Sequence, residues 1–251
     1  MKMKHLLYIL TFLITSLSFG QSEPLFEQGK ERYKEGKYQY AINSWMKVLD
    51  NDEHSANLYF NLGNAHYKLN NVGPSIFYYE KALQLDPLDN DIKTNLAFAE
   101  NARIDSIEPL PKTIFTKWYT MLSGVLGFNG WATLAVIFSM LFVLLFLLYY
   151  FSATERKKRL LFVGSLLSVL VLVVSLALAF QIQTDVGKDK PAIIFAESSE
   201  VKSEPNMGSE VSFKLHEGTK VQIIENDDSW VRIQLIDGKD GWIPASDLKA
   251  L

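Results

Sequence analysis

The sequence predicts a multidomain membrane protein with an all-α helical repeat array, a two-helix transmembrane hairpin and a small all-β barrel. Three observations predict this fold class. A 34-residue period runs through the amino-terminal part of the chain. Two uncharged runs flank a short basic turn in the middle of the chain. Short β-rich runs, separated by turn residues, fill the carboxyl-terminal part.

The hairpin is predicted from the uncharged runs. No charged residue occurs from 118 to 154 or from 160 to 184. A membrane-spanning helix needs about 20 mostly apolar residues. Trp131–Phe151 and Leu160–Phe180 meet this requirement and are the predicted transmembrane helices, joined by a basic loop over residues 152–159.

The basic loop predicts the orientation of the hairpin. Residues 155–159 carry four basic side chains and one acidic side chain. Short loops rich in Lys and Arg stay in the cytoplasm, so both flanking parts are expected outside it. Before the first span, the apolar stretch Ile114–Phe128 is interrupted by Gly124 and Gly127. We expect residues 105–130 to form a linker and interfacial segment on the outer leaflet.

The amino terminus gives an independent indication of export. Lys2, Lys4 and His5 precede an apolar stretch, Leu6–Leu17, and small residues follow at 18–20. This pattern predicts a signal peptide over residues 1–20. An uncleaved membrane anchor is the alternative, and both interpretations export residue 21 onward.

Composition excludes several kinds of chemistry. The chain has 251 residues, a formal net charge of −3 and no cysteine. This charge gives no electrostatic reason to bind nucleic acid. The absence of cysteine excludes disulfides, thiolate metal sites and a cysteine nucleophile. Only four histidines occur, and they are scattered, so no metal site or cofactor is expected. The sequence contains no familiar catalytic motif, and we expect no enzymatic activity.

The amino-terminal part consists of two segments of equal length. Residues 22–55 align with residues 56–89 at an offset of 34. This period resembles the tetratricopeptide repeat, a helix–turn–helix unit. A capping helix is expected over residues 89–104. The glycines should let two helices approach closely, and the aromatic residues should fill the gap to the next unit. The aligned pairs include Gly29 with Gly63, Ala41 with Ser75, and Trp45 with Tyr79.

The resemblance implies a concave groove that holds a peptide or protein segment. The first helices of each pair line this groove in the family. The alternative is that the asparagines only satisfy helix and repeat geometry and that the lysines are solvated. By position, the groove residues are expected to be Lys30, Tyr33, Lys34, Asn61, Asn64, Tyr67, Lys68 and Asn95.

The carboxyl-terminal part is predicted to be a small barrel. Close spacing of short strands and turn residues indicates a small sandwich or barrel. Residues 215–221, 230–233 and 237–244 resemble a bacterial SH3 domain, which is expected over residues 190–251, and Val201–Pro205 fits the first loop of that family. The strands are expected at Ala192–Ala196, Val211–Leu215, Lys220–Glu225, Trp230–Leu235 and Gly241–Pro244.

The SH3 resemblance implies a second binding surface. It assigns a peptide groove to Trp230, Trp242 and Pro244. Asp247 stands where this groove would have a tyrosine, and the alternative is that both tryptophans are packing residues. Domains of this family commonly bind cell-wall peptides or proteins.

The order of these parts resembles the BatE-like proteins of the Bacteroides aerotolerance group. That resemblance implies a bacterial inner (cytoplasmic) membrane protein with both soluble domains in the periplasm. It also implies von Willebrand-type A-domain membrane proteins as partners. The first functional hypothesis is a non-enzymatic scaffold for protein assembly in an aerotolerance or envelope-stress complex. The alternative is a peptidoglycan-binding or cell-wall-sensing membrane protein that acts through the SH3-like domain.

Overall fold

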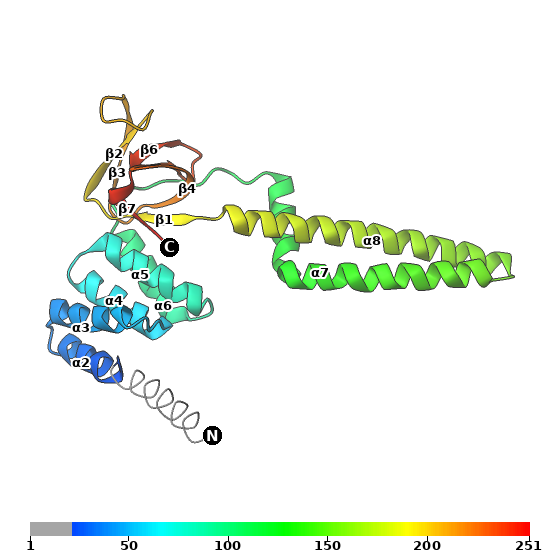
Figure 1. Ribbon diagram of the computed structural model, residues 1–251, viewed down its shortest axis with the longest axis horizontal. Helices are drawn as coiled ribbons and strands as arrows, with labels where there is room; N and C mark the ends of the chain where they lie inside the picture. The colour runs from blue at the N-terminus through cyan, green and yellow to red at the C-terminus, as the bar shows by residue number, and fades with distance from the viewer. Residues whose placement is uncertain (1–21) are drawn as a thin grey trace, which may run out of the picture. The chain divides into compact units, whose positions relative to one another are not determined.

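The computed structural model describes residues 22–251, and the signal peptide predicted at residues 1–20 lies outside this range. The chain forms two compact units. Among the described residues, one unit combines those up to Glu108 with Lys190–Leu251, and the other is Pro109–Asp189. Figure 1 shows helices and a sheet in the first unit and a long helical hairpin in the second. The predicted multidomain layout is confirmed.

The repeat array begins with two antiparallel helix pairs and ends with a single helix. Ser55 and Asp89 accept hydrogen bonds from backbone N–H groups in the first turns of α4 and α6, so both helices begin at a capping side chain. The predicted capping helix is α6. The helices are α2 (Ser22–Lys34), α3 (Tyr38–Asp50), α4 (Ala56–Lys68), α5 (Val72–Leu85) and α6 (Asn90–Asn101).

The repeat glycines let aromatic rings lie against the neighbouring helix. Trp45 is 1% exposed, and a Cβ atom on Gly29 would overlap its indole ring. A Cβ atom on Gly63 would stand only 2.6 Å from the ring of Tyr79. Each ring therefore covers the glycine of its own repeat. Trp45 also belongs to a buried cluster that contains Leu62 of the second repeat.

The β part is one antiparallel sheet in the order β3-β2-β6-β5-β4-β1-β7. Side chains from most of its strands enter one buried cluster, so the sheet curls around a common core. The strands are β1 (Pro191–Ile194), β2 (Ser198–Lys202), β3 (Val211–His216), β4 (Lys220–Asp227), β5 (Trp230–Gln234), β6 (Asp240–Pro244) and β7 (Leu248–Ala250), with a short helix η1 (Ala245–Asp247) before β7.

Two of these strands differ from the sequence expectation. β2 was not among the predicted strands and includes the start of the predicted loop Val201–Pro205. Val201 is completely buried in the sheet core and pairs with Phe213, which places it in a strand. β7 pairs with β1 and has only three residues, too few for a periodic signal in the sequence.

Strand β1 joins the repeat array to the barrel. Ala192 and Ile194 lie in the barrel core, whereas Ile193 belongs to a buried cluster with Ile76 and Leu96 of the repeats. Successive strand residues point to opposite faces, so β1 is covered on both sides. The repeats and the barrel are therefore packed together in one unit.

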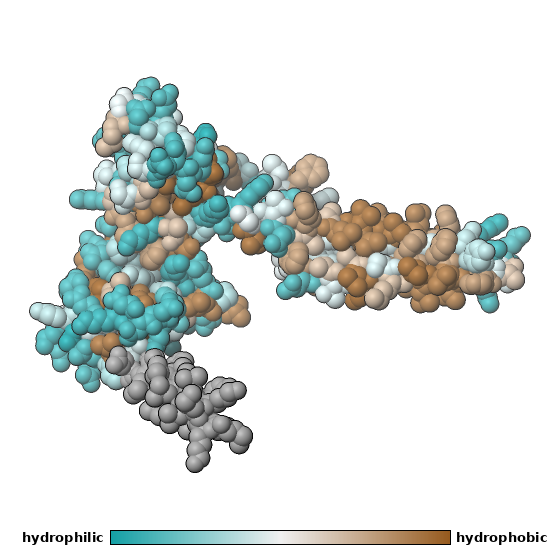
Figure 2. All heavy atoms as spheres, in the orientation of Figure 1, coloured by the Kyte–Doolittle hydropathy of each residue, from teal (hydrophilic) through white to brown (hydrophobic). Residues whose placement is uncertain are grey.

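The second unit is a hairpin of two long apolar helices, α7 (Ile114–Phe151) and α8 (Glu155–Lys188). Both are long and apolar enough to cross a membrane. Figure 2 shows hydrophobic atoms over much of the hairpin surface. α7 is interrupted at Gly127, where φ is 60° and ψ is −176°. The basic residues expected in the loop 152–159 instead form the start of α8, since Arg and Lys are good helix formers.

Candidate functional site

A pocket of about 320 Å³ opens on the repeat array. Five predicted groove residues line it, together with two aromatic residues that the prediction did not include. No acidic side chain is among these lining residues, and Lys68 contributes a positive charge. The pocket therefore offers aromatic surface, amide groups and one cation. Its lining residues are Tyr33, Asn64, Tyr67, Lys68, Tyr79, Asn95 and Phe98.

Asn64 organises the polar side of this pocket. Its Oδ1 accepts a hydrogen bond of 2.7 Å from the Tyr79 hydroxyl and one of 2.8 Å from Asn95 Nδ2. Burial raises the pKa of Tyr79, so the hydroxyl stays protonated and donates. An amide oxygen has two lone pairs, and both are used here. The Nδ2 of Asn64 and the Oδ1 of Asn95 remain as a donor and an acceptor for a peptide-like group.

The other predicted groove residues do not line this pocket. Lys30 is 2.8 Å from Glu27 in an ion pair and lies over the ring of Phe26. Lys34 is exposed and Asn61 is half-buried. The family resemblance assigned these three to the groove by their positions on the first helices, whereas Lys30 pairs locally with Glu27.

Sequence reasoning missed Tyr79 and Phe98 as pocket residues. Tyr79 was assigned to packing, but its hydroxyl reaches Asn64 from the second helix of the repeat. Phe98 is 56% exposed on α6. It lies 34 residues after Asn64, so the repeat offset itself would have placed it beside the groove.

The predicted SH3-like groove residues share one face of the strand pair β5 and β6. Trp230 pairs with Pro244, and Arg232 pairs with Trp242. All four are half-buried, whereas Val231, which alternates with them, enters the core. The structure thus gathers the three predicted residues and adds Arg232. That arginine was missed, although its spacing of two residues from Trp230 places it on the same face.

Arg232 is held in place by carboxylates. Its Nη2 is 2.6 Å from Asp240 Oδ2, and its Nη1 is 3.7 Å from Glu225 Oε2. The Arg232 side chain is 42% exposed, so these pairs position it and contribute little to stability. The face combines two indoles with a fixed planar cation.

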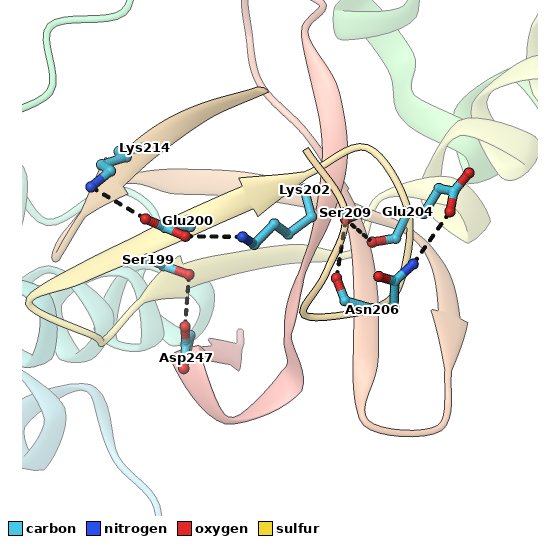
Figure 3. A network of polar contacts seen from close by, with 8 residues as sticks. All are labelled: Ser199, Glu200, Lys202, Glu204, Asn206, Ser209, Lys214 and Asp247. Carbon is cyan, nitrogen blue, oxygen red and sulfur yellow. Dashed lines mark hydrogen bonds and ion pairs between the residues drawn. The ribbon is translucent and has the colours of Figure 1, made fainter. Parts of the chain in front are cut away.

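A polar network explains why Asp247 does not act as a groove residue. Figure 3 shows the Asp247 carboxylate directed at Ser199, whose hydroxyl donates to it at 2.7 Å. The Asp247 carbonyl also accepts from the backbone N–H of Phe195. In the same view Glu200 lies between Lys202 and Lys214, and these two lysines lower the pKa of Glu200. Asp247 therefore connects the short helix η1 to β2 through its carboxylate and to the β1–β2 turn through its carbonyl.

Asp105, in the linker after α6, forms hydrogen bonds with the barrel. Its Oδ2 accepts hydrogen bonds of 2.7 Å from the backbone N–H of His216 and from the Thr219 hydroxyl. Its Oδ1 accepts from the His216 ring at 2.8 Å. The Asp105 side chain is 13% exposed. We call this group of Asp105, His216 and Thr219 the Asp105 latch.

Further contacts support the same junction. Glu80 of α5 is 2.7 Å from Lys220 of β4. The backbone N–H of Gly73 donates to Glu217, and Phe77 meets Phe195 edge to face. The repeats and the barrel therefore contact each other through apolar, charged and backbone groups at one interface.

Three family models match parts of the chain. The model described as bacterial SH3 domain matches residues 198–249. A TPR repeat model matches residues 29–70, and a tetratricopeptide repeat model matches residues 56–88. The chain contains tetratricopeptide repeats and a bacterial SH3 domain. Such repeats suggest protein–protein interaction, and such a domain suggests cell-wall binding.

Comparison of the chain with whole proteins of known sequence or structure gives only weak similarity. The search of curated proteins found no match. Among solved structures, an NlpC/P60 family protein from Bacillus cereus ATCC 10987 is 14% identical, with a TM-score of 0.22. The match covers 28% of this chain and 23% of that protein, so this chain spans less than a quarter of its length. A likeness of this size does not bear on function. Among the described residues, no group of His, Asp and Glu side chains is arranged to hold a metal ion.

Proposed function

We propose that the protein is a non-enzymatic membrane scaffold that holds a peptide-binding repeat groove and an SH3-like face in one unit. The hairpin anchors this unit to the bacterial inner membrane, with both soluble domains in the periplasm. The basic start of α8 then stays in the cytoplasm, as the positive-inside rule requires. By resemblance, the complex it serves acts in aerotolerance or envelope stress, with von Willebrand-type A-domain membrane proteins as partners.

The observation that carries this proposal is the groove pocket around Asn64. Its donor and acceptor amides suit the backbone of an extended peptide, and its aromatic rings suit apolar side chains. Lys68 and the lack of lining carboxylates favour a neutral or acidic segment. The packing of the repeats on the barrel supports a scaffold role, because two surfaces of one unit can hold two partners at high effective concentration.

Photo-crosslinking in intact cells tests the groove. A photoreactive amino acid replaces Tyr67, which lines the pocket and is 40% exposed. The matched control replaces Tyr40, a tyrosine of the same array that is 61% exposed and lies beside Arg32 instead. We expect crosslinks to envelope proteins from position 67 and few from position 40. Equal yields from both positions, or none from position 67, would contradict groove binding.

A second candidate function is peptidoglycan binding through the SH3-like face. Trp230, Arg232 and Trp242 favour it, since they present stacking surfaces and a cation side by side. The full chain in detergent micelles should then sediment with purified cell wall. The Trp230→Ala and Trp242→Ala variants should lose that sedimentation, and an Asn64→Ala variant should keep it. No sedimentation of the unaltered chain would exclude this function and leave the groove function untouched.

A further inference from the structure

The part of α7 before Gly127 differs from the rest of the hairpin. Gly127 has a positive φ, and a Cβ atom on Gly130 would stand 2.7 Å from Leu126 Cβ, so two glycines permit a sharp bend. The indole of Trp131 donates to the Leu122 carbonyl across the bend at 3.2 Å. Figure 1 shows that this first part of α7 runs across α8, whereas the later part runs alongside it. We call residues 114–126 the crossing helix.

The crossing helix is strongly amphipathic. At 100° per residue, its large apolar side chains occupy an arc of about 140°, and the opposite arc holds Thr116, Lys117, Thr120, Ser123 and Gly124. The apolar residues form what we call the crossing stripe, and they are at least 39% exposed within the chain. The stripe consists of Ile114, Phe115, Trp118, Met121, Leu122, Val125 and Leu126.

A hydrogen bond fixes the level of the crossing helix along the hairpin. The Tyr119 hydroxyl donates to Asp185 of α8, and Gln181 donates to the other oxygen of the same carboxylate at 2.8 Å. Asp185 follows the apolar stretch Leu160–Phe180. Five residues beyond Phe180 correspond to about 7.5 Å of helix. The hydrogen bond therefore places the Tyr119 hydroxyl just beyond the end of that apolar stretch.

We propose that the crossing stripe is buried in the lipid of the outer leaflet, with the crossing helix lying in the plane of the membrane surface. This inference rests on the proposed membrane anchoring. An amphipathic helix at the boundary of the hydrocarbon buries its apolar face about 5–10 Å into the headgroup and acyl region. The stripe belongs to α7, a helix long and apolar enough to cross a membrane. Because the stripe lies directly before the predicted span, we expect lipid to cover it.

Lipid contact also explains the residue types of the crossing helix. Trp118 and Tyr119 have rings with one polar atom, which suits a membrane–water boundary. Lys117 and the hydroxyl residues lie on the arc that would face water. The bend at Gly127 is then what separates a helix in the membrane plane from a helix that crosses the bilayer.

Single-cysteine labelling tests this inference, because the natural chain has no cysteine. The full chain is reconstituted alone in phosphatidylethanolamine and phosphatidylglycerol vesicles and treated with a membrane-impermeant maleimide. Phe115→Cys, Met121→Cys and Val125→Cys report on the stripe, and Lys117→Cys and Thr120→Cys are controls on the same helix. All five sites share one side of the membrane, so their ratio does not depend on how the vesicles are oriented. Each rate is normalised to labelling after denaturation.

We expect the stripe sites to be labelled about tenfold more slowly than the control sites. Burial of one large apolar side chain favours the protected state by about this factor. A shallow lipid nitroxide should quench a fluorophore on Met121→Cys, which separates lipid from burial against a second copy. Equal labelling of both sets, or protection without quenching, would overturn the inference.

A reference site on α7 distinguishes failure of this inference from failure of the proposed membrane anchoring. Val143 is 54% exposed in the later part of α7, and Val143→Cys should be protected and quenched most strongly by a deep lipid nitroxide. If Val143→Cys is protected and the stripe is labelled, the crossing helix lies in water and membrane anchoring stands. If Val143→Cys is itself labelled, the hairpin is not in the bilayer and both proposals fail.

Discussion

Removing the carboxylate of the Asp105 latch should loosen the junction between the repeats and the barrel. In Asp105→Ala, the His216 N–H and the Thr219 hydroxyl lose an acceptor that now lies at 2.7 Å from each. Hydrogen bonds to a charged group contribute about 1.5–3 kcal/mol each. With water replacing part of the loss, we expect the free energy of local opening to fall by about 3 kcal/mol. Opening should then be about 100-fold more frequent.

Amide hydrogen exchange measures this opening directly. The full chain in vesicles is compared with Asp105→Ala, and exchange is followed in peptides that contain residues 216–220. The control is Glu108→Ala, which removes an exposed carboxylate from the same linker. We expect exchange of these peptides to be about 100-fold faster in Asp105→Ala and unchanged in the control. Equal exchange in both variants would refute the latch as a stabilising contact.

The pH dependence of amide exchange provides a second test of the Asp105 latch. Burial by itself would raise the pKa of Asp105, but the hydrogen bonds from Thr219 and His216 outweigh it and lower the pKa. A lowered pKa in the folded state means that the latch stabilises fully above the unfolded value of about 3.9. Its contribution is lost as the pH falls through the folded value. Protection of these amides, relative to the intrinsic exchange rate at each pH, should therefore fall below about pH 4 in the natural chain and not in Asp105→Asn.

Three further predictions concern the repeats, the junction and the hairpin. Burial, followed by the charge of Lys249, lowers the pKa of His66 to about 4. His66 thus binds fewer protons when folded, and lowering the pH from 7.5 to 5 should cost the array about 2 kcal/mol. Urea unfolding followed by circular dichroism should show this loss, and His66→Phe should reduce it. Gly218 has a φ of 85° and a Cβ atom there would stand 3.0 Å from Ile76, so Gly218→Ala should speed protease cleavage in the linker at residues 105–112. Protection of that linker equal to the natural chain would contradict a tight junction. Gly127→Ala should disfavour the bend, because only glycine tolerates φ of 60° with ψ of −176°. The difference in maleimide labelling between Met121→Cys and Thr120→Cys should then shrink, and an unchanged difference would argue against the glycine as the hinge.

The sequence by itself determined the elements whose signals are local. The 34-residue offset aligns Gly29 with Gly63 and Trp45 with Tyr79, because a repeat must bury the same helix faces in each copy. The structure adds that each ring lies against the glycine of its own repeat. Charge-free length alone identifies α7 and α8 as candidate spans. The tetratricopeptide resemblance, read by position on the first helices, named Tyr33, Asn64, Tyr67, Lys68 and Asn95, and these five line one pocket.

The tertiary structure decided how the parts meet. Residues 191–196 form an unbroken apolar run, typical of a strand covered on both faces, but the sequence does not say which element covers the second face. The structure shows that Ile193 packs into the repeat core and Ile194 into the barrel. The Asp105 latch joins residues more than 100 positions apart. Contacts at such separation leave no period in the sequence, because they depend on which folded surfaces match in shape and charge.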